Sequence, residues 1–261
     1  MGVYNVNGES LLQDSAPQIK VPWVSAAHTG FSTSTVAPNT LQAFHRAFLN
    51  GSDWIECDVR VTKDGGYIIN HDPTVTVNGV TYTIVNETTE TLTNLVLSTD
   101  VKYGECKIPT LESVLKLCSF TGMKMNIDCK SIEPQSLTKL VIDNGMSGKS
   151  AYANMSISDA EIILANDPNA GFIFNSADIS TWLAFLTDYH VRQRSFTWNY
   201  QTTISEIENA RKNGIGFLSA GTNASNYQVI MDLKPDMVEF VDSVDFKLLN
   251  KQYLDSINLG V

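Results

Sequence analysis

The sequence contains no stretch of about 18 consecutive apolar residues, the length that a membrane-spanning helix needs. We therefore expect no transmembrane segment. Residues 1–20 also lack the basic start and the apolar run of a secretory signal peptide, so no signal peptide is predicted. The compartment stays open, because a cytoplasmic protein and a part of a larger extracellular or phage assembly both fit these absences.

Basic residues are scarce, since 18 Lys and Arg stand against 28 Asp and Glu and give a formal net charge of −10. A groove for nucleic acid would show clustered Lys and Arg, which this chain lacks. No nucleic-acid partner is therefore expected. An anionic substrate would need local positive charge, from a bound metal ion or from a well-placed lysine.

Cysteines are few, and the four in the chain have no spacing typical of a metal site. Cys57 and Cys129 lie on predicted strands and are expected to be small core residues, whereas a disulfide between Cys106 and Cys118 stays open. The dense cysteine framework of a small secreted domain is absent. With 261 residues, 43% of them hydrophobic and 18% charged, the chain is long enough for one large globular domain or two small ones.

The most informative segment is residues 54–72, where two acidic residues interrupt an apolar strand pattern. Side chains alternate along a strand, so Glu56 and Asp58 share one face, with Cα atoms about 7 Å apart. Both carboxylates can therefore reach one ion. A Lys-Asp-Gly-Gly sequence typical of a turn follows. A short return strand at residues 67–69 would bring His71 back towards the two acids.

Strand and helix patterns alternate along the chain. Strands are predicted at residues 21–27, 54–61, 123–130, 151–155, 171–175, 191–198, 215–220 and 237–241. Helices are predicted near residues 40–49, 110–117, 135–144, 158–165, 179–187, 204–213, 227–233 and 246–257. Eight strand–helix units in about 250 residues predict an α/β TIM (β/α)8 barrel. An open doubly wound sheet is the alternative, but no glycine-rich phosphate loop follows the first strand.

The predicted barrel spans residues 21–261 and follows an N-terminal extension at residues 1–20. Residues 72–108 are rich in Thr, Val and Asn and show little helical periodicity. We therefore expect them to form a small loop-rich insertion after the second strand of the barrel.

In a TIM barrel the chemistry lies where the strands end. Six polar residues fall at that end of the predicted barrel: His28, Glu56, Asp58, His71, Asp128 and Lys130. Three carboxylates at one point repel one another by about 3 kcal/mol per pair at ~5 Å and an effective dielectric of about 20. Lys130 would offset one negative charge, and one divalent cation would offset the other two. Because the three carboxylates would bind a metal through oxygen atoms alone, Ca²⁺ or Mg²⁺ is favoured over zinc.

Two further candidate residues have two interpretations each. Trp198 ends the sixth predicted strand, where it would either stack on a substrate or fill the rim of the barrel. Arg60 shares the strand face of the two acids and would either contact the substrate or lie at the surface. His45 and His190 are expected at the surface.

Several short motifs follow one another in a fixed order over residues 21–130. They are His28-x-Gly30, Asn39-Thr40-Leu41-x-Ala43-Phe44, Glu56-x-Asp58-Val59-x-x-Thr62-x-Asp64-Gly65, His71-Asp72, Pro109-Thr110-Leu111-Glu112-x-x-Leu115 and Asp128-x-Lys130. In this combination the chain resembles the glycerophosphodiester phosphodiesterase family. Beyond residue 130 the resemblance is one of architecture alone.

The resemblance implies a TIM barrel with an inserted subdomain at residues 72–108 and a role for each of the six residues. By position, the metal ligands would be Glu56, Asp58 and Asp128, the general base and acid His28 and His71, and the phosphate ligand Lys130. In that family the neighbouring glycerol hydroxyl attacks the phosphorus atom, the alcohol leaves, and water opens the cyclic phosphate. An imidazole that titrates near about pH 6.5 suits these proton transfers.

The chain departs from the family pattern at four places. Thr29 stands where the family usually has Arg, which removes a bidentate phosphate contact and makes Thr29 itself, or Arg60, a candidate substrate ligand. Pro38 replaces a usual Glu, and Asp128 is shorter than the usual Glu at the third metal position. Residues 219–222 replace a Trp-Thr-x-Asn sequence at the far rim. These differences affect the expected substrate more than the expected reaction.

The predicted function is metal-dependent hydrolysis of glycerophosphodiesters, either small molecules or polymers such as teichoic acids, to glycerol phosphate and an alcohol. Two alternatives stay open. A phospholipase resembling sphingomyelinase D shares the barrel, the two histidines and Asp128-x-Lys130, and would leave a cyclic phosphate. A non-catalytic module that binds phosphate or glycan on a larger assembly is compatible with Thr29 and the polar N-terminal extension.

Overall fold

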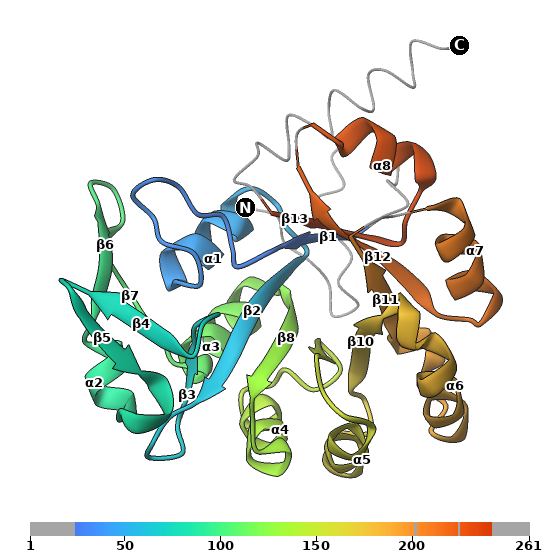
Figure 1. Cartoon of the computed structure of the whole chain (residues 1–261), viewed down its shortest axis with the longest axis horizontal. Helices are drawn as coiled ribbons and strands as arrows, with labels where there is room; N and C mark the ends of the chain where they lie inside the picture. Colours follow the sequence, from blue (N-terminus) through green and yellow to red (C-terminus); the bar gives the residue numbers. More distant parts are fainter. Residues whose placement is uncertain (1–23, 201–202, 224, 242–261) are drawn as a thin grey trace.

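A computed structural model describes residues 24–200, 203–223 and 225–241. Its centre is a closed barrel of eight parallel strands (Figure 1): β1 (Val24–Ala27), β2 (Trp54–Val61), β8 (Lys124–Ser131), β9 (Ser150–Ala153), β10 (Gly171–Asn175), β11 (Phe196–Asn199), β12 (Gly216–Thr222) and β13 (Met237–Phe240). Neighbouring strands pair in the order β1-β13-β12-β11-β10-β9-β8-β2, and a pairing between β1 and β2 closes the ring. The predicted TIM barrel is confirmed, and each predicted strand has a counterpart.

Seven helices surround the barrel in the described part of the chain: α1 (Leu41–Leu49), α3 (Leu111–Thr121), α4 (Pro134–Asp143), α5 (Ile157–Asn166), α6 (Ile179–Asp188), α7 (Ile204–Lys212) and α8 (Tyr227–Leu233). Their ends follow from local chemistry. The Thr40 side chain accepts a hydrogen bond from the backbone of Ala43, and Thr110 caps α3 in the same way. Gly122, with φ of 80°, ends α3. The predicted extension at residues 1–20 and the predicted helix at residues 246–257 lie outside the described residues.

The insertion contains more regular structure than a loop-rich segment would have. β3 (Tyr67–Ile69) pairs antiparallel with β2, as the predicted return strand requires. Two hairpins then follow, β4 (Thr74–Val77) with β5 (Val80–Thr83) and β6 (Val96–Asp100) with β7 (Gly104–Lys107). Between them lie a 3-10 turn, η1 (Ile84–Asn86), and the short helix α2 (Thr89–Thr93).

The first hairpin turns at Asn78 and Gly79, which both have positive φ, as a two-residue turn between strands requires. The Thr-Val alternation of β4 and β5 thus forms strands, where the sequence analysis expects loops. A small core of Ile68, Ile84, Leu92 and Ile108 packs the insertion against β3.

The sixth predicted strand begins later than expected. Residues 192–194 form a 3-10 turn, η3 (Arg192–Arg194), and the strand itself starts at Phe196. The Arg-Gln-Arg sequence interrupts the apolar alternation, which is the physical reason for the late start. Val191 is still buried, but it packs into the core from this turn.

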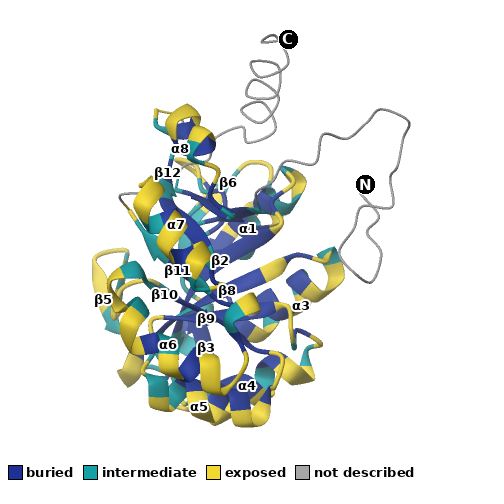
Figure 2. Cartoon of the chain, turned by 90° about the vertical axis from the view of Figure 1, so that its right-hand side faces the viewer, coloured by how far each residue is buried: buried dark blue, intermediate teal, exposed yellow. Residues whose placement is uncertain are grey.

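The hydrophobic core lies in two layers. The main layer fills the space between the strands and the helices, where Figure 2 shows buried strands under helices whose outer faces are exposed. Cys57 and Cys129 belong to this layer, as predicted, and all four cysteines are free, so Cys106 and Cys118 form no disulfide. None of the described helices is long and apolar enough to cross a membrane.

A second, smaller layer fills the inside of the barrel. Its members are Ala26, Trp54, Ala151, Ala153, Ile173, Leu218, Ala220 and Met237. Half of these side chains are single methyl groups, so they do not fill the barrel up to its carboxyl end. A cavity therefore opens there.

Candidate active site

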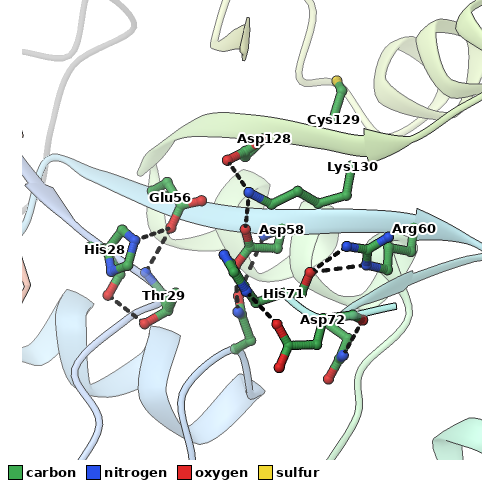
Figure 3. Close-up of polar contacts among 12 residues, drawn as sticks. His28, Thr29, Glu56, Asp58, Arg60, His71, Asp72, Asp128, Cys129 and Lys130 are labelled. Carbon is green, nitrogen blue, oxygen red and sulfur yellow. Dashed lines mark hydrogen bonds and ion pairs between the residues drawn. The ribbon is translucent and has the colours of Figure 1, made fainter. Parts of the chain in front are cut away.

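Three carboxylates meet at the carboxyl ends of β2 and β8. The two strands run side by side in register, with Asp58 opposite Asp128 and Glu56 opposite Asn126. One oxygen from each of Glu56, Asp58 and Asp128, called the acidic triad below, lies within 4.8 Å of the others. The alternation predicted from the sequence thus brings these three acids together, as Figure 3 shows.

The acidic triad is held by hydrogen bonds from three sides. The Lys130 ammonium lies 2.8 Å from Asp128 Oδ2 and 3.2 Å from Asp58 Oδ1. The Asn39 amide donates to Asp58 Oδ2 at 2.7 Å. The backbone N–H of Thr29 donates to Glu56 Oε2 at 2.9 Å.

Asn39 holds the acidic triad through Asp58, a role that its place before a helix does not predict. Thr40 is the N-cap of α1, while Asn39 adopts a left-handed backbone with φ of 56°. That conformation is tolerated by asparagine better than by most residues. It directs the amide towards Asp58 instead of the helix.

The loop after β1 is fixed by Gly30. Its φ is 76°, and a Cβ built there would lie 2.7 Å from the backbone of Ala43. Only glycine fits so close to α1. The loop therefore lies tightly on the helix and aims the Thr29 N–H at Glu56.

Electrostatics at the triad favour a bound cation. Burial, with the charge of Asp58 added, raises the pKa of Glu56 well above its ordinary value. Burial alone would lower the pKa of Lys130, but its contacts with Asp128 and Asp58 raise it, so the ammonium stays charged. The single positive charge of Lys130 does not neutralise the charge of three carboxylates.

The donor set fits one divalent cation. All the side chains of the triad offer oxygen atoms, which suits Ca²⁺ or Mg²⁺. Asp128 Oδ1 is buried and has no hydrogen-bond partner among the described residues. A buried carboxylate oxygen of that kind is available for a metal ion.

His28 lies beside the triad. Its backbone N–H donates to the carbonyl of Phe240 at 2.9 Å, which extends the pairing of β1 with β13. Its Nε2 lies 3.9 Å from Glu56 Oε2. Burial lowers the pKa of His28 below 6.5, partly offset by Asp58, so the ring is neutral at neutral pH and can accept a proton.

His71 lies at the outer edge of this group. Its side chain is 62% exposed, and its Nδ1 lies 2.8 Å from Asp72 Oδ1. The charge of His71 contributes to lowering the pKa of His28, so the two rings lie within electrostatic range. Arg60 donates from Nε to the carbonyl of His71 at 3.0 Å and so holds the loop (Figure 3).

A cavity of about 600 Å³ opens above the barrel interior. Its polar side is lined by His28, Glu56, Asn126, Asp128, Lys130 and Glu239. Its opposite side carries apolar and aromatic side chains, Ile173, Phe174, Trp182, Trp198 and Leu218, beside the polar Asn154, Asn175 and Asp178. The cavity thus joins a charged half to a half that offers aromatic surface among polar groups.

The other predicted substrate ligands differ in their relation to this cavity. Trp198 lines it and packs edge-to-face on Tyr200, with ring centroids 5.0 Å apart. Thr29, Arg60 and His71 are not among the described residues that line it. The Thr29 hydroxyl donates to the carbonyl of His28 at 2.8 Å. The roles of these residues towards a substrate stay predictions.

Glu239 and Asn126 also line the cavity, although neither is among the candidate residues predicted for the site. Glu239 is only 7% exposed and comes from β13, which the sequence presents as a plain core strand. Burial, followed by the charges of Asp128 and Asp58, raises the pKa of Glu239 to about 7. A single acid at alternating position in an apolar strand, the pattern also seen at Glu56, is the signal that could have found it.

We expect the metal-free protein to lose stability as the pH rises from about 5 to about 8. A carboxyl group whose pKa is raised by folding stabilises the fold below its unfolded pKa, and this contribution is lost as the pH rises through its folded pKa. For Glu239, a shift from 4.5 to about 7 corresponds to on the order of 3 kcal/mol in the free energy of unfolding. Thermal unfolding in EDTA across this pH range measures it.

The Glu239→Gln variant is the control for this pH dependence. The neutral amide removes the titration, so its unfolding temperature should fall less with rising pH than that of the wild type. Equal slopes in the two proteins would contradict the prediction.

Comparison with known proteins agrees with this geometry. Residues 28–149 match the Glycerophosphoryl diester phosphodiesterase family. A glycerophosphodiester phosphodiesterase of Caldanaerobacter subterraneus subsp. tengcongensis is 30% identical over 205 residues, which cover 72% of this chain and 81% of the relative. The chain belongs to the glycerophosphoryl diester phosphodiesterase family. The predicted family and enzyme class are thereby confirmed.

Solved structures show the same fold for this phosphodiesterase. The glycerophosphodiester phosphodiesterase of Agrobacterium tumefaciens superposes with a TM-score of 0.71 at 21% identity, covering 86% of this chain and 98% of its own. A phosphodiesterase of Oleispira antarctica, solved with the product sn-glycerol-3-phosphate, has a TM-score of 0.71 at 20% identity, covering 89% of this chain and 96% of its own.

Proposed function

We propose that this phosphodiesterase hydrolyses glycerophosphodiesters to glycerol phosphate and an alcohol with one divalent cation, Ca²⁺ or Mg²⁺. The observation that carries the proposal is the acidic triad, whose oxygens lie within 4.8 Å of one another beside Lys130 at the polar side of the cavity. A bound cation would supply charge neutralisation to the phosphodiester there. The product-bound relative from Oleispira antarctica supports the same substrate class.

His28 is the proposed general base in this reaction. Its neutral ring lines the cavity next to Glu56, so it can take the proton of a glycerol hydroxyl that attacks the phosphorus atom. Lys130 faces the same space and would neutralise a phosphate oxygen. The attack displaces the alcohol and leaves a cyclic phosphate, which water then opens to glycerol phosphate.

His71 is the proposed general acid for the leaving alcohol. The His71 side chain is exposed at the outer edge of the site. It would therefore protonate a leaving oxygen that points towards solvent. The carboxylate of Asp72 at Nδ1 would fix the orientation of the ring and leave Nε2 to carry the transferred proton. Arg60 would contribute by holding the backbone of His71 in place through its hydrogen bond to the His71 carbonyl.

The far wall of the cavity is where the leaving alcohol would bind. Trp198 and Trp182 face this space with large apolar surfaces. The described residues leave a cavity at the carboxyl end of the barrel, so the end of a polymer such as a teichoic acid is a proposed substrate as well as a small diester. In this proposal the phosphate would bind at the charged side of the cavity and the alcohol at the aromatic side.

The test is a metal-dependent product assay. Protein treated with EDTA is resupplied with Ca²⁺ or Mg²⁺ and incubated with glycerophosphocholine, glycerophosphoglycerol and a glycerol teichoic acid, and ³¹P NMR identifies the products. Glycerol phosphate is expected only when metal is present. A lasting cyclic phosphate from a choline lipid would point to the phospholipase reaction instead. Binding without turnover of any diester would favour the non-catalytic module.

A further inference from the structure

The loop at residues 28–40, called the β1–α1 loop below, holds the acidic triad from two sides. The Thr29 N–H donates to the carboxylate of Glu56 (Figure 3). The Asn39 amide donates to the carboxylate of Asp58. The two donors also meet at the base of the loop, where the Asn39 N–H donates to the carbonyl of Thr29 at 2.8 Å. The placement of two of the three acids therefore depends on the conformation of this loop.

Both residues at the base of the β1–α1 loop have a strained backbone. Thr29 has φ of 53° and Asn39 has φ of 56°, in the left-handed region. Asparagine tolerates that region, but a β-branched threonine rarely adopts it. Such a conformation persists only where the surrounding structure holds it in place. The loop therefore depends on contacts with other parts of the molecule.

Hairpin β6–β7 of the insertion lies against this loop (Figure 1). The Thr35 hydroxyl donates to Asp100 Oδ2 at 2.6 Å, and the Ala37 N–H donates to Ser98 Oγ at 3.1 Å. Asp100 is itself fixed, because its Oδ1 accepts from two backbone N–H groups of the hairpin turn at 2.8 and 3.0 Å. The hairpin thus presents two held acceptors to the loop.

Apolar packing joins the same two segments. Val36 of the loop, Ala43 of α1 and Cys106 of β7 are fully buried and form a small core. Tyr103 from the hairpin turn packs against this core. Because protein interiors are close-packed, a shift of one side of such a core displaces the other side. The loop is therefore packed between α1 and the hairpin, and the position of the hairpin influences that of the loop.

The hairpin itself does not reach the cavity. None of the described residues that line the cavity comes from residues 96–107. Its effect on the site must therefore pass through the β1–α1 loop. The connection is short, because Ala37 lies only two residues before Asn39, which holds Asp58.

We propose that hairpin β6–β7 positions the metal ligands of the acidic triad, with Asp100 and Ser98 as positioning residues that act through the β1–α1 loop. This proposal rests on the proposed function, because it takes the triad as the metal site. Partners that orient metal ligands from outside typically change metal affinity by about 10–100-fold when they are replaced. The insertion thus contributes to metal binding without providing a ligand.

The test is calorimetric titration of Ca²⁺ and of Mg²⁺ into the metal-free protein. Thr35→Val keeps the shape of the side chain but removes the donor to Asp100, and Ser98→Ala removes the acceptor for the Ala37 N–H. The combined variant should have a metal dissociation constant about tenfold above that of the wild type. Its kcat at saturating metal should stay close to the wild-type value, because excess ion restores the ligand geometry by mass action.

Two variants separate positioning from a general loss of stability. Thr35→Ser keeps the hydroxyl that Asp100 accepts from, so it should bind metal as the wild type does. Thr76→Val removes the contact of Thr76 with Thr81, 2.9 Å long, from the other hairpin of the insertion, and should leave the metal dissociation constant unchanged. If the combined variant does not fold, Thr35→Val alone, at an exposed residue, should shift the constant in the same direction.

An unchanged dissociation constant in the combined variant would overturn the inference, because the packing of Gly30 against α1 would then suffice to hold the loop. An equal rise in Thr76→Val, or a rise in Thr35→Ser as large as in Thr35→Val, would overturn it too. Failure of the proposed function gives different results. The wild type would then bind neither ion, which would remove the inference as well, or would bind metal and release no glycerol phosphate from any diester.

Discussion

Replacement of His28 by alanine is expected to lower kcat for glycerophosphodiester hydrolysis by about 10³-fold, within the range that general base catalysis contributes. The ring lines the cavity, lies 3.9 Å from Glu56, and has a pKa that burial lowers, so it is ready to accept a proton at neutral pH. Alanine leaves the attacking hydroxyl without an acceptor. The triad ligands stay in place, so the affinity for the metal ion should change little.

The matched control is His45→Ala. His45 is exposed on α1, where it stacks on Phe48, and lies outside the cavity. Its replacement should leave kcat within about twofold of the wild type, since a surface substitution away from the site changes little. Steady-state kinetics with calorimetric metal titration distinguish the two variants. An unchanged kcat in His28→Ala would remove the imidazole from the mechanism.

Much of the fold could be predicted because local pattern and tertiary structure agree. Among the described residues, each barrel strand before β13 is a short apolar run followed later in the chain by a helix, so the order of the strands in the sequence already gives their order in the ring. The helix Tyr227–Leu233 has the predicted bounds because polar turns flank a short apolar stripe. The structure of the insertion was harder to predict, because Thr-Val hairpins and Thr-rich loops have similar compositions. Only Asn78 and Gly79 distinguish the first hairpin.

The acidic triad could be predicted since period-two alternation alone places Glu56 and Asp58 on one face and Asp128 on the next strand. Glu239 could not be found with equal ease. It lines the same cavity from β13, and no local pattern reports that β13 and β8 meet there, because the two strands are far apart in sequence. The same holds for the contact of Asn39 with Asp58.

Glu56→Gln is expected to change activity and metal-free stability in opposite directions. The glutamine keeps the size of the side chain and an oxygen for the Thr29 N–H, but it removes one negative charge from a group of buried carboxylates. Relief of repulsion and of carboxylate desolvation should stabilise the metal-free fold by roughly 1–3 kcal/mol at about pH 8. Loss of one charged ligand should weaken metal binding and lower kcat/KM by at least about 100-fold.

The measurement is thermal unfolding with and without Ca²⁺ or Mg²⁺, together with kinetics. The wild type should gain stability on metal addition, because a ligand that binds only the folded state stabilises it by mass action. Glu56→Gln should start from a higher unfolding temperature and gain much less. Glu112→Gln, the same substitution in an exposed ion pair on α3, should behave as the wild type in both assays. An undiminished metal-induced gain in Glu56→Gln would mean that the cation binds elsewhere, because the charge that Glu56 contributes to the triad is what the ion would neutralise.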